Sequence, residues 1–168
     1  ADNPPPFVLQ SPNQPGPAPA SSMTRIRSLI ISRNWLMDTN ILSEACKPQP
    51  NAQVLELMNR YKLEFCTAAP VWHELRFGWL RMPDGQRKDK IGRYIQQVVS
   101  AIAVLPYDEA AARIHANIRR ECEQMGLVLS FVDGQIASIA MAHGLTLVTR
   151  NLKDFEHIQG LRVVSWFG

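Results

Sequence analysis

The chain has 168 residues, of which 46% are hydrophobic and 20% are charged, which is enough for one good core but too few for two comfortable domains. Its formal net charge of +3 permits a polyanionic partner but falls short of the strongly basic balance that indicates nucleic-acid binding. No apolar run approaches the roughly 20 residues that span a bilayer, and the amino end lacks the basic and apolar regions of a secretory signal. We therefore expect one globular domain in a soluble, cytoplasmic protein with no membrane partner.

Cysteine and histidine spacing argues against the usual zinc and redox motifs. The three cysteines lie far apart and form no CxxC pair, which predicts reduced thiols. The histidines show no HxxxH or other ligand spacing, so we expect each of them at a helix surface or helix end. They are His73, His115, His143 and His157.

The amino end differs in composition from the rest of the chain. Residues 1–22 hold seven of the twelve prolines and cannot build a packed core. We expect a disordered linker or extension there, with a proline-rich docking segment as the less favoured alternative. Residues 23–34 contain a short apolar run at 29–31, which either lengthens the first strand or forms a separate piece.

From residue 35 onward the hydrophobic pattern alternates between strands and helices, which predicts an α/β fold with a parallel sheet covered on both faces. Strands are expected at 35–37, 63–67, 102–105, 145–149 and 162–166. Helices are expected at 40–46, 52–61, from 70 through 79, at 91–102, from 108 to 126 and at 131–143. Asn40, Asn51 and Asp108 are the expected helix caps, and Pro70 suits a first helical turn.

Acidic residues recur near the transitions from strand to helix. Asp38 ends the first strand, Glu74 lies one turn into the helix after the second, and Asp133 begins the helix before the fourth. Asn151 and Asp154 follow that fourth strand. Because the carboxyl ends of parallel strands share one edge of the sheet, these side chains are expected to converge there.

Converging carboxylates suit a divalent metal. Their oxygens are the ligands that Mg²⁺ or Mn²⁺ prefers, and such an ion lowers the pKa of bound water to make a nucleophile. Phosphodiester hydrolysis is the natural use of that chemistry.

Each acid also has a plainer interpretation. Asp38 is placed where it would simply cap the next helix, Glu74 where it would pair with a nearby arginine on a helix surface, and Asp154 where it would be an ordinary turn residue. Asp133 is harder to explain in this way, because its helix face points towards the interior, where an unpaired carboxylate is costly.

Four motifs, in this order, resemble the PIN domain of the VapC and FitB toxin type. The motifs are Asp38-Thr39-Asn40-Ile41-Leu42-Ser43-Glu44, Glu74-Leu75-Arg76-Phe77-Gly78, Asp133-Gly134-Gln135-Ile136-Ala137, and Leu147-Val148-Thr149-Arg150-Asn151 with Asp154-Phe155. The resemblance spans residues 35–168. It implies a three-layer α/β/α sandwich, a Mg²⁺- or Mn²⁺-dependent ribonuclease acting on RNA, a homodimer, and control by a cognate antitoxin, with DNA bound only indirectly through the antitoxin.

The resemblance also implies roles for individual residues. Asp38, Glu74 and Asp133 map onto the acids that bind metal and activate water. We prefer Asp154 as the fourth catalytic acid, with Asn151 as a weaker neutral ligand or a substrate contact.

The remaining implied roles support the acids. Thr39 and Thr149 would hydrogen-bond to the acids or to a phosphate, and Asn40 would brace the loop after the first strand; in the plainer interpretation all three are turn and cap residues. Arg76, one helical step beyond Glu74, is a candidate for contacting phosphate or orienting an acid. The basic stretch 81–93 either holds an RNA backbone or is a solvated helix face.

Three other functions are alternatives to the nuclease. A phosphatase that forms an aspartyl-phosphate would need an acid where Asn40 stands, and a dinucleotide-binding enzyme would need a GxGxxG motif after the first strand. The serious rival is a PIN-fold binding module that has lost efficient catalysis and works only in a complex with protein or RNA. Metal-dependent cleavage discriminates it from the enzyme.

Overall fold

The computed structural model describes residues 33–168. The expectations for residues 1–22, and for all but the last two residues of 23–34, fall outside this range. In the described part, no helix is long and apolar enough to cross a membrane.

Five short strands form one sheet in the order β3-β2-β1-β4-β5. Every neighbouring pair is parallel, which confirms the predicted topology. The strands are β1 Trp35–Met37, β2 Phe65–Ala68, β3 Val104–Leu105, β4 Thr146–Val148 and β5 Arg162–Val164. β2 begins two residues later than expected, and β3 has only two residues and follows a 3-10 turn at Val99–Ala101.

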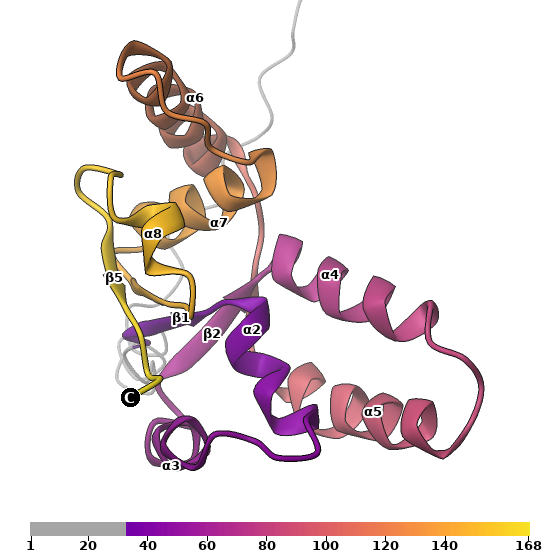
Figure 1. Cartoon of the computed structure of the whole chain (residues 1–168). Coiled ribbons are helices and arrows are strands. Elements are labelled where there is room, and N and C mark those ends of the chain that lie inside the picture. Colours follow the sequence, from indigo (N-terminus) through magenta and orange to yellow (C-terminus); the bar gives the residue numbers. More distant parts are fainter. Residues whose placement is uncertain (1–32) are drawn as a thin grey trace, which may run out of the picture. The chain divides into compact units, whose positions relative to one another are not determined.

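Helices connect the strands and cover both sides of the sheet. They are α2 Thr39–Leu42, α3 Ala52–Arg60, α4 Ala69–Leu80, α5 Gln86–Gln97, α6 Glu109–Gln124, α7 Phe131–Ala142 and α8 Leu152–Phe155, with 3-10 turns at Glu44–Cys46 and Val99–Ala101. Figure 1 shows α6 and α7 on one side of the strands and α3 and α5 on the other. This is the α/β/α sandwich that the motifs implied.

Side-chain caps mark the starts of four of the seven α-helices in the described part of the chain. The side chains of Asn51 and Asp108 accept hydrogen bonds from backbone N–H groups at the starts of α3 and α6, as predicted. For the first helix the cap at Asn40 was wrong and the alternative cap, Asp38, is confirmed, since its side chain accepts a hydrogen bond from the backbone N–H of Thr39. The start of α5 was also wrong: it begins at residue 86, directly after Gly85 at φ +151°, and its first turn is polar and exposed, so apolar periodicity does not reveal it. Residues 152–155 form the short helix α8 where a turn was expected.

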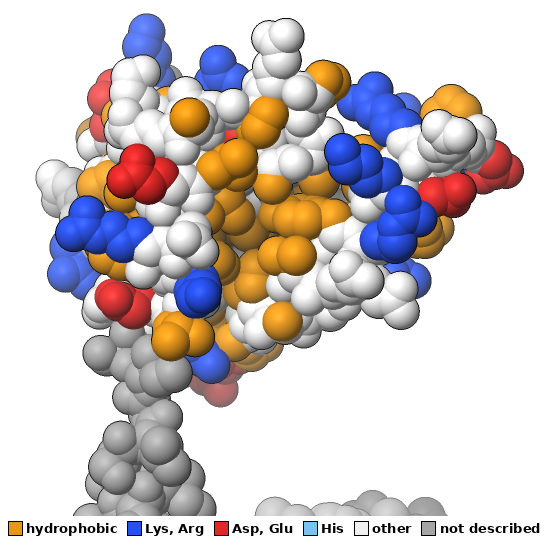
Figure 2. Space-filling view, turned by 90° about the horizontal axis from the view of Figure 1, so that it is seen from below, with side chains coloured by type: hydrophobic (Ala, Val, Ile, Leu, Met, Phe, Trp, Pro, Cys, Tyr) orange, Lys and Arg blue, Asp and Glu red, His pale blue; other side chains and the backbone are white. Residues whose placement is uncertain are grey.

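The core lies around the two central strands. Leu36, Met37, Leu147 and Val148 are fully buried, as expected for parallel strands that are covered on both faces. Hydrophobic side chains are not confined to this core. The lower face shown in Figure 2 is hollowed over a floor of hydrophobic side chains, with Lys and Arg side chains standing on both sides of the hollow.

His115 was placed wrongly by its sequence spacing. It was expected at a helix surface or end, but its side chain is only 2% exposed. It belongs to the buried stripe of α6, which also contains Ala111, Ile118 and Cys122.

Candidate active site

Asp38 is the most enclosed of the candidate acids. It directly follows β1, is 6% exposed, and its backbone N–H donates to the carbonyl of Val148 at 3.0 Å. Its carboxylate accepts a 2.7 Å hydrogen bond from the backbone N–H of Thr39 and another of 2.7 Å from Thr149 Oγ1. The carboxylate is therefore fixed between the ends of two neighbouring strands.

Asn40 joins the loops that follow β1 and β4. Its Nδ2 donates weakly to Asp38 Oδ2 at 3.4 Å and to Thr149 Oγ1 at 3.3 Å, and its Oδ1 accepts from the backbone N–H of Arg150 at 2.9 Å. The backbone N–H of Asn151 also donates to Thr149 Oγ1, at 3.1 Å. The side chain thus links the acid-bearing loop after β1 to the loop after β4.

Glu74 lies on the middle of α4 and is held by the loop after β1. Thr39 Oγ1 donates to Glu74 Oε2 at 2.5 Å. Because Thr39 also starts α2, this bond ties the first turn of α2 to α4. The hydroxyls of Thr39 and Thr149 therefore each donate to one acid, Glu74 and Asp38 respectively.

Asp133 completes the group from the first turn of α7. Its backbone N–H is bonded to Ser130 Oγ at 3.0 Å, which caps the helix. Burial raises the pKa of Asp133, although the Ser130 hydrogen bond opposes the shift, and the negative charges of Asp154 and Glu74 raise it further. The sequence placed this side chain towards the interior, and it is half-buried in the structure.

Mutual repulsion acts on Asp38 as well. Burial raises its pKa above the ordinary value, the bonds from Thr149 and Thr39 counteract this, and the charges of Asp133 and Glu74 add to the increase. These carboxylates are thus close enough to disfavour one another's ionised forms. A bound cation would relieve that repulsion, so the donor set suits Mg²⁺ or Mn²⁺.

The acids do not form a closed metal cage. Within residues 33–168, no three His, Cys, Asp or Glu side chains lie close enough together to enclose an ion. The arrangement is an open acidic cluster in which Asp38 is fixed and its neighbours stand further off, as suits a cation that keeps several waters.

Two supporting candidates lie apart from this cluster. The Arg76 guanidinium lies over the Trp79 ring at 5.8 Å, and no hydrogen bond between it and the acids is found in the described part of the chain. Asn151 is exposed, and its backbone N–H donates to Thr149 Oγ1. Asp154 acts on Asp133 through its charge.

Comparison with known proteins identifies the family. The profile of the PIN domain matches residues 36–161, three-quarters of the chain. The chain belongs to the PIN domain family.

Its relatives include named toxins and ribonucleases. This PIN domain is 35% identical over 135 residues to the VapC ribonuclease Y4jK of Sinorhizobium fredii, covering 77% of this chain and 95% of that one. It is 34% identical over 125 residues to toxin FitB of Neisseria gonorrhoeae, covering 71% of this chain and 89% of the relative. The crystal structure of FitAcB from Neisseria gonorrhoeae superposes with a TM-score of 0.73 at 32% identity, covering 79% of this chain and 97% of that one.

Glu44 is a buried acid of the PIN domain that sequence reasoning did not single out as functional. It is 3% exposed, its Oε1 accepts from the backbone N–H of Asn51 at 2.8 Å, and it pairs with Lys47 at 2.5 Å. Burial alone would raise the pKa of Glu44, but the bonds from Lys47 and Asn51 and the charges of Lys47 and Arg150 lower it overall. Its position at the end of the first motif was the available signal.

A groove opens beside the acids of the PIN domain. It has a volume of about 310 Å³ and runs between α2, α4 and α5, starting at Thr39 and Glu74. Its walls are largely apolar and include Leu75, Met82, Ile91 and Tyr94. The groove therefore offers an apolar surface next to the acidic cluster, where an apolar side chain of a partner could bind.

Proposed function

We propose that this protein is a metal-dependent endoribonuclease that acts as the toxin of a toxin–antitoxin pair. The observation that carries the proposal is the buried carboxylate of Asp38, fixed at the carboxyl edge of the sheet and repelled by Asp133 and Glu74. The likeness to a VapC ribonuclease and to toxin FitB supports it. Since RNA and the antitoxin are found in the cytoplasm, we propose that location for the protein.

The acids have distinct proposed roles. Asp38 and Asp133 would hold Mg²⁺ or Mn²⁺ with Glu74 beside them, and the ion would supply an activated water and neutralise charge on the phosphate. Thr149 and Thr39 keep Asp38 in one orientation. Asp154 completes the acidic pocket, and Asn151, exposed after β4, contacts the substrate.

The reaction is hydrolysis of an RNA phosphodiester. Water gives up a proton and its oxygen bonds to phosphorus in line with the 3′-oxygen. The bond from phosphorus to the 3′-oxygen breaks, the 3′-oxygen takes up a proton and leaves as a 3′-hydroxyl, and the other product carries a 5′-phosphate. The exposed cations of α5, which include Arg87, Lys90 and Arg93, are placed to attract the RNA backbone. Arg76 is a further phosphate contact.

Cleavage of total RNA tests the proposal. Purified protein is incubated with Mg²⁺ or Mn²⁺, beside an EDTA control and the Asp38→Asn variant. Discrete products that disappear in both controls establish a metal-dependent endoribonuclease. Cleavage that persists in Asp38→Asn refutes the assigned roles.

The neutral side chain of Asn151, which would bind a cation more weakly than a carboxylate, favours one second candidate, a PIN-fold binding module with weak catalysis. Absence of cleavage with any metal, in protein freed of co-purified inhibitors, supports this second function.

The apolar groove beside the acids is the proposed antitoxin site. A partner segment with apolar side chains would fill the groove while a basic side chain reaches Glu74 and Asp38. Mixing the protein with the product of the neighbouring gene should suppress cleavage. Ile91→Glu should weaken this suppression, since Ile91 lines the groove. Cleavage by the variant alone is measured beside it, so that suppression is compared with the variant's own activity. Leu63→Glu, at an exposed apolar position outside the groove, is the matched control, since it introduces the same charge.

Exposed hydrophobic side chains support the proposed homodimer. Phe77 and Leu80 on α4, and Val128 and Phe131 at the junction of α6 and α7, all stand open to solvent. Contiguous apolar patches at a surface commonly mark protein contacts, whereas single apolar side chains do not, and we propose that these side chains belong to such a patch. A second copy of the chain is the partner that we propose for them.

A further inference from the structure

His115 is a buried titratable residue that the proposed reaction does not use. Its Nδ1 lies 2.9 Å from the hydroxyl of Tyr107, while its Nε2 is buried with no hydrogen-bond partner in the described part of the chain. Leaving a buried polar atom unpaired is unfavourable, so packing at this position must compensate for it. Tyr107 fixes the orientation of the ring, and the free edge faces α7.

The ring occupies the space above Gly134. A Cβ atom added at Gly134 would lie 2.6 Å from His115 Cδ2 and closer still to Nε2. No real Cβ approaches other atoms so closely, so glycine is required here by the histidine and not by backbone conformation. Gly134 directly follows Asp133.

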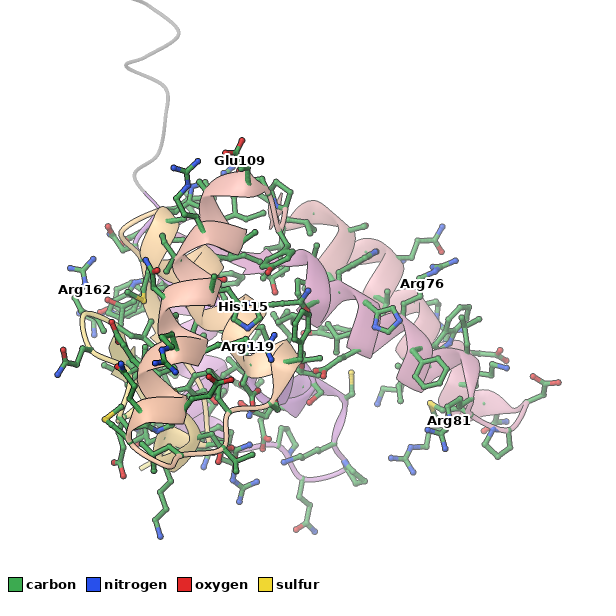
Figure 3. All side chains as sticks on the ribbon, turned by 90° about the horizontal axis from the view of Figure 1, so that it is seen from above. Arg76, Arg81, Glu109, His115, Arg119 and Arg162 are labelled. Carbon is green, nitrogen blue, oxygen red and sulfur yellow. The ribbon has the colours of Figure 1, made fainter. Side chains whose placement is uncertain are left out.

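A second side chain of α6 holds the same turn of α7. The Arg119 guanidinium lies 5.6 Å from the centre of the Phe131 ring, and the His115 and Phe131 rings are 4.8 Å apart at 60°. Figure 3 shows His115 and Arg119 on one side of α6, beside the start of α7. Two side chains of α6 therefore pack against the first turn of α7, which carries Asp133.

We propose that His115 is a positioning residue for Asp133. Its ring seats directly on Gly134 and sets how close the first turn of α7 lies to α6. The Ser130 cap holds the same turn from its amino end. Together these contacts fix Asp133 relative to Asp38. This inference rests on the proposed metal-dependent function.

Mn²⁺ binding, measured by calorimetry on metal-free protein, tests the inference without RNA. His115→Ala removes the ring and Gly134→Ala pushes the turn away from it, so each should weaken Mn²⁺ binding about tenfold or more, as loss of outer-shell support does at other metal sites. His115→Phe keeps a flat ring against Gly134 and should restore affinity to within about threefold of the wild type, even where loss of the Tyr107 bond lowers the melting temperature. His143→Ala, at the exposed far end of α7, is the matched control and should leave affinity unchanged.

The outcomes separate the two proposals. If His115→Ala lowers the melting temperature but leaves Mn²⁺ affinity at the wild-type value, the ring is only a core residue and the inference is wrong. If the wild type binds Mn²⁺ but cleaves no RNA, the ribonuclease proposal fails, while the Mn²⁺ comparison still decides the role of His115. If the wild type binds no Mn²⁺, both are overturned.

Discussion

Replacing Thr149 by valine removes one hydroxyl from the fully buried residue that follows β4 and leaves the shape of the side chain almost unchanged. That hydroxyl donates to Asp38 at 2.7 Å. A hydrogen bond to a charged group contributes about 1.5–3 kcal/mol to stability, and one between neutral groups about 0.5–1.5 kcal/mol. The loss should therefore be larger when Asp38 is ionised than when it is protonated.

The direction of the pH dependence follows from the raised pKa of Asp38 in the folded protein. A raised pKa means that the stability contributed by this group is fully present below the ordinary value of 3.8 and is lost as pH rises through the folded pKa. Thr149→Val raises the pKa of Asp38 further, so the variant should lose more stability with rising pH than the wild type. The difference in free energy of unfolding should grow from pH 4 to pH 8.

Urea denaturation of the metal-free protein across this pH range provides the assay. Thr149→Ser keeps the hydroxyl and controls for the lost methyl group. We expect Thr149→Val to lose about 1.5–3 kcal/mol at pH 8 and less at pH 4. An equal loss at both ends of the range would refute the reasoning, because the bond would then not depend on the charge of Asp38.

Three further changes probe other parts of the molecule. Asp38→Asn should abolish RNA cleavage but raise the melting temperature of metal-free protein at pH 7, since burial and neighbouring acids oppose the ionised form; a lower melting temperature would contradict this. Tyr94→Phe should lower the free energy of unfolding by about 0.5–1.5 kcal/mol, because its hydroxyl donates to the Leu42 carbonyl at 2.8 Å; an unchanged urea midpoint would count against it. Phe77→Asp should convert a dimer into a monomer in light scattering, and a dimer that persists would place the interface elsewhere.

Sequence patterns predicted the features of the fold that depend on residues close together in the chain, such as helix caps. Asn51 and Asp108 were recognised as caps because their side chains complete a helix end within three residues. The parallel order followed from alternating periodicity, and the edge that gathers Asp38, Glu74 and Asp133 followed from the shared direction of the strands. Cap choice failed at Asn40, where a contact to Thr149 more than a hundred residues away determines the side-chain position.

The environment of His115 shows what such signals miss. Its position four residues after Ala111 and three before Ile118 was a sign of burial, since those residues share one face of α6. The contact with Gly134 was beyond reach, because it depends on how closely α6 and α7 approach each other. The spacing of residues within one helix gives no information on the distance between two helices.

The brace made by Asn40 has a consequence for how the protein is made. Its partners, Thr149 and Arg150, lie more than a hundred residues later in the chain, and Asp38 gains its Thr149 bond only when β4 pairs beside β1. A chain emerging from the ribosome therefore exposes Asp38 long before the residues that orient it have been synthesised. Because contacts so distant in sequence form late, the acidic cluster is assembled only when translation is nearly finished, and a prematurely ended chain lacks it.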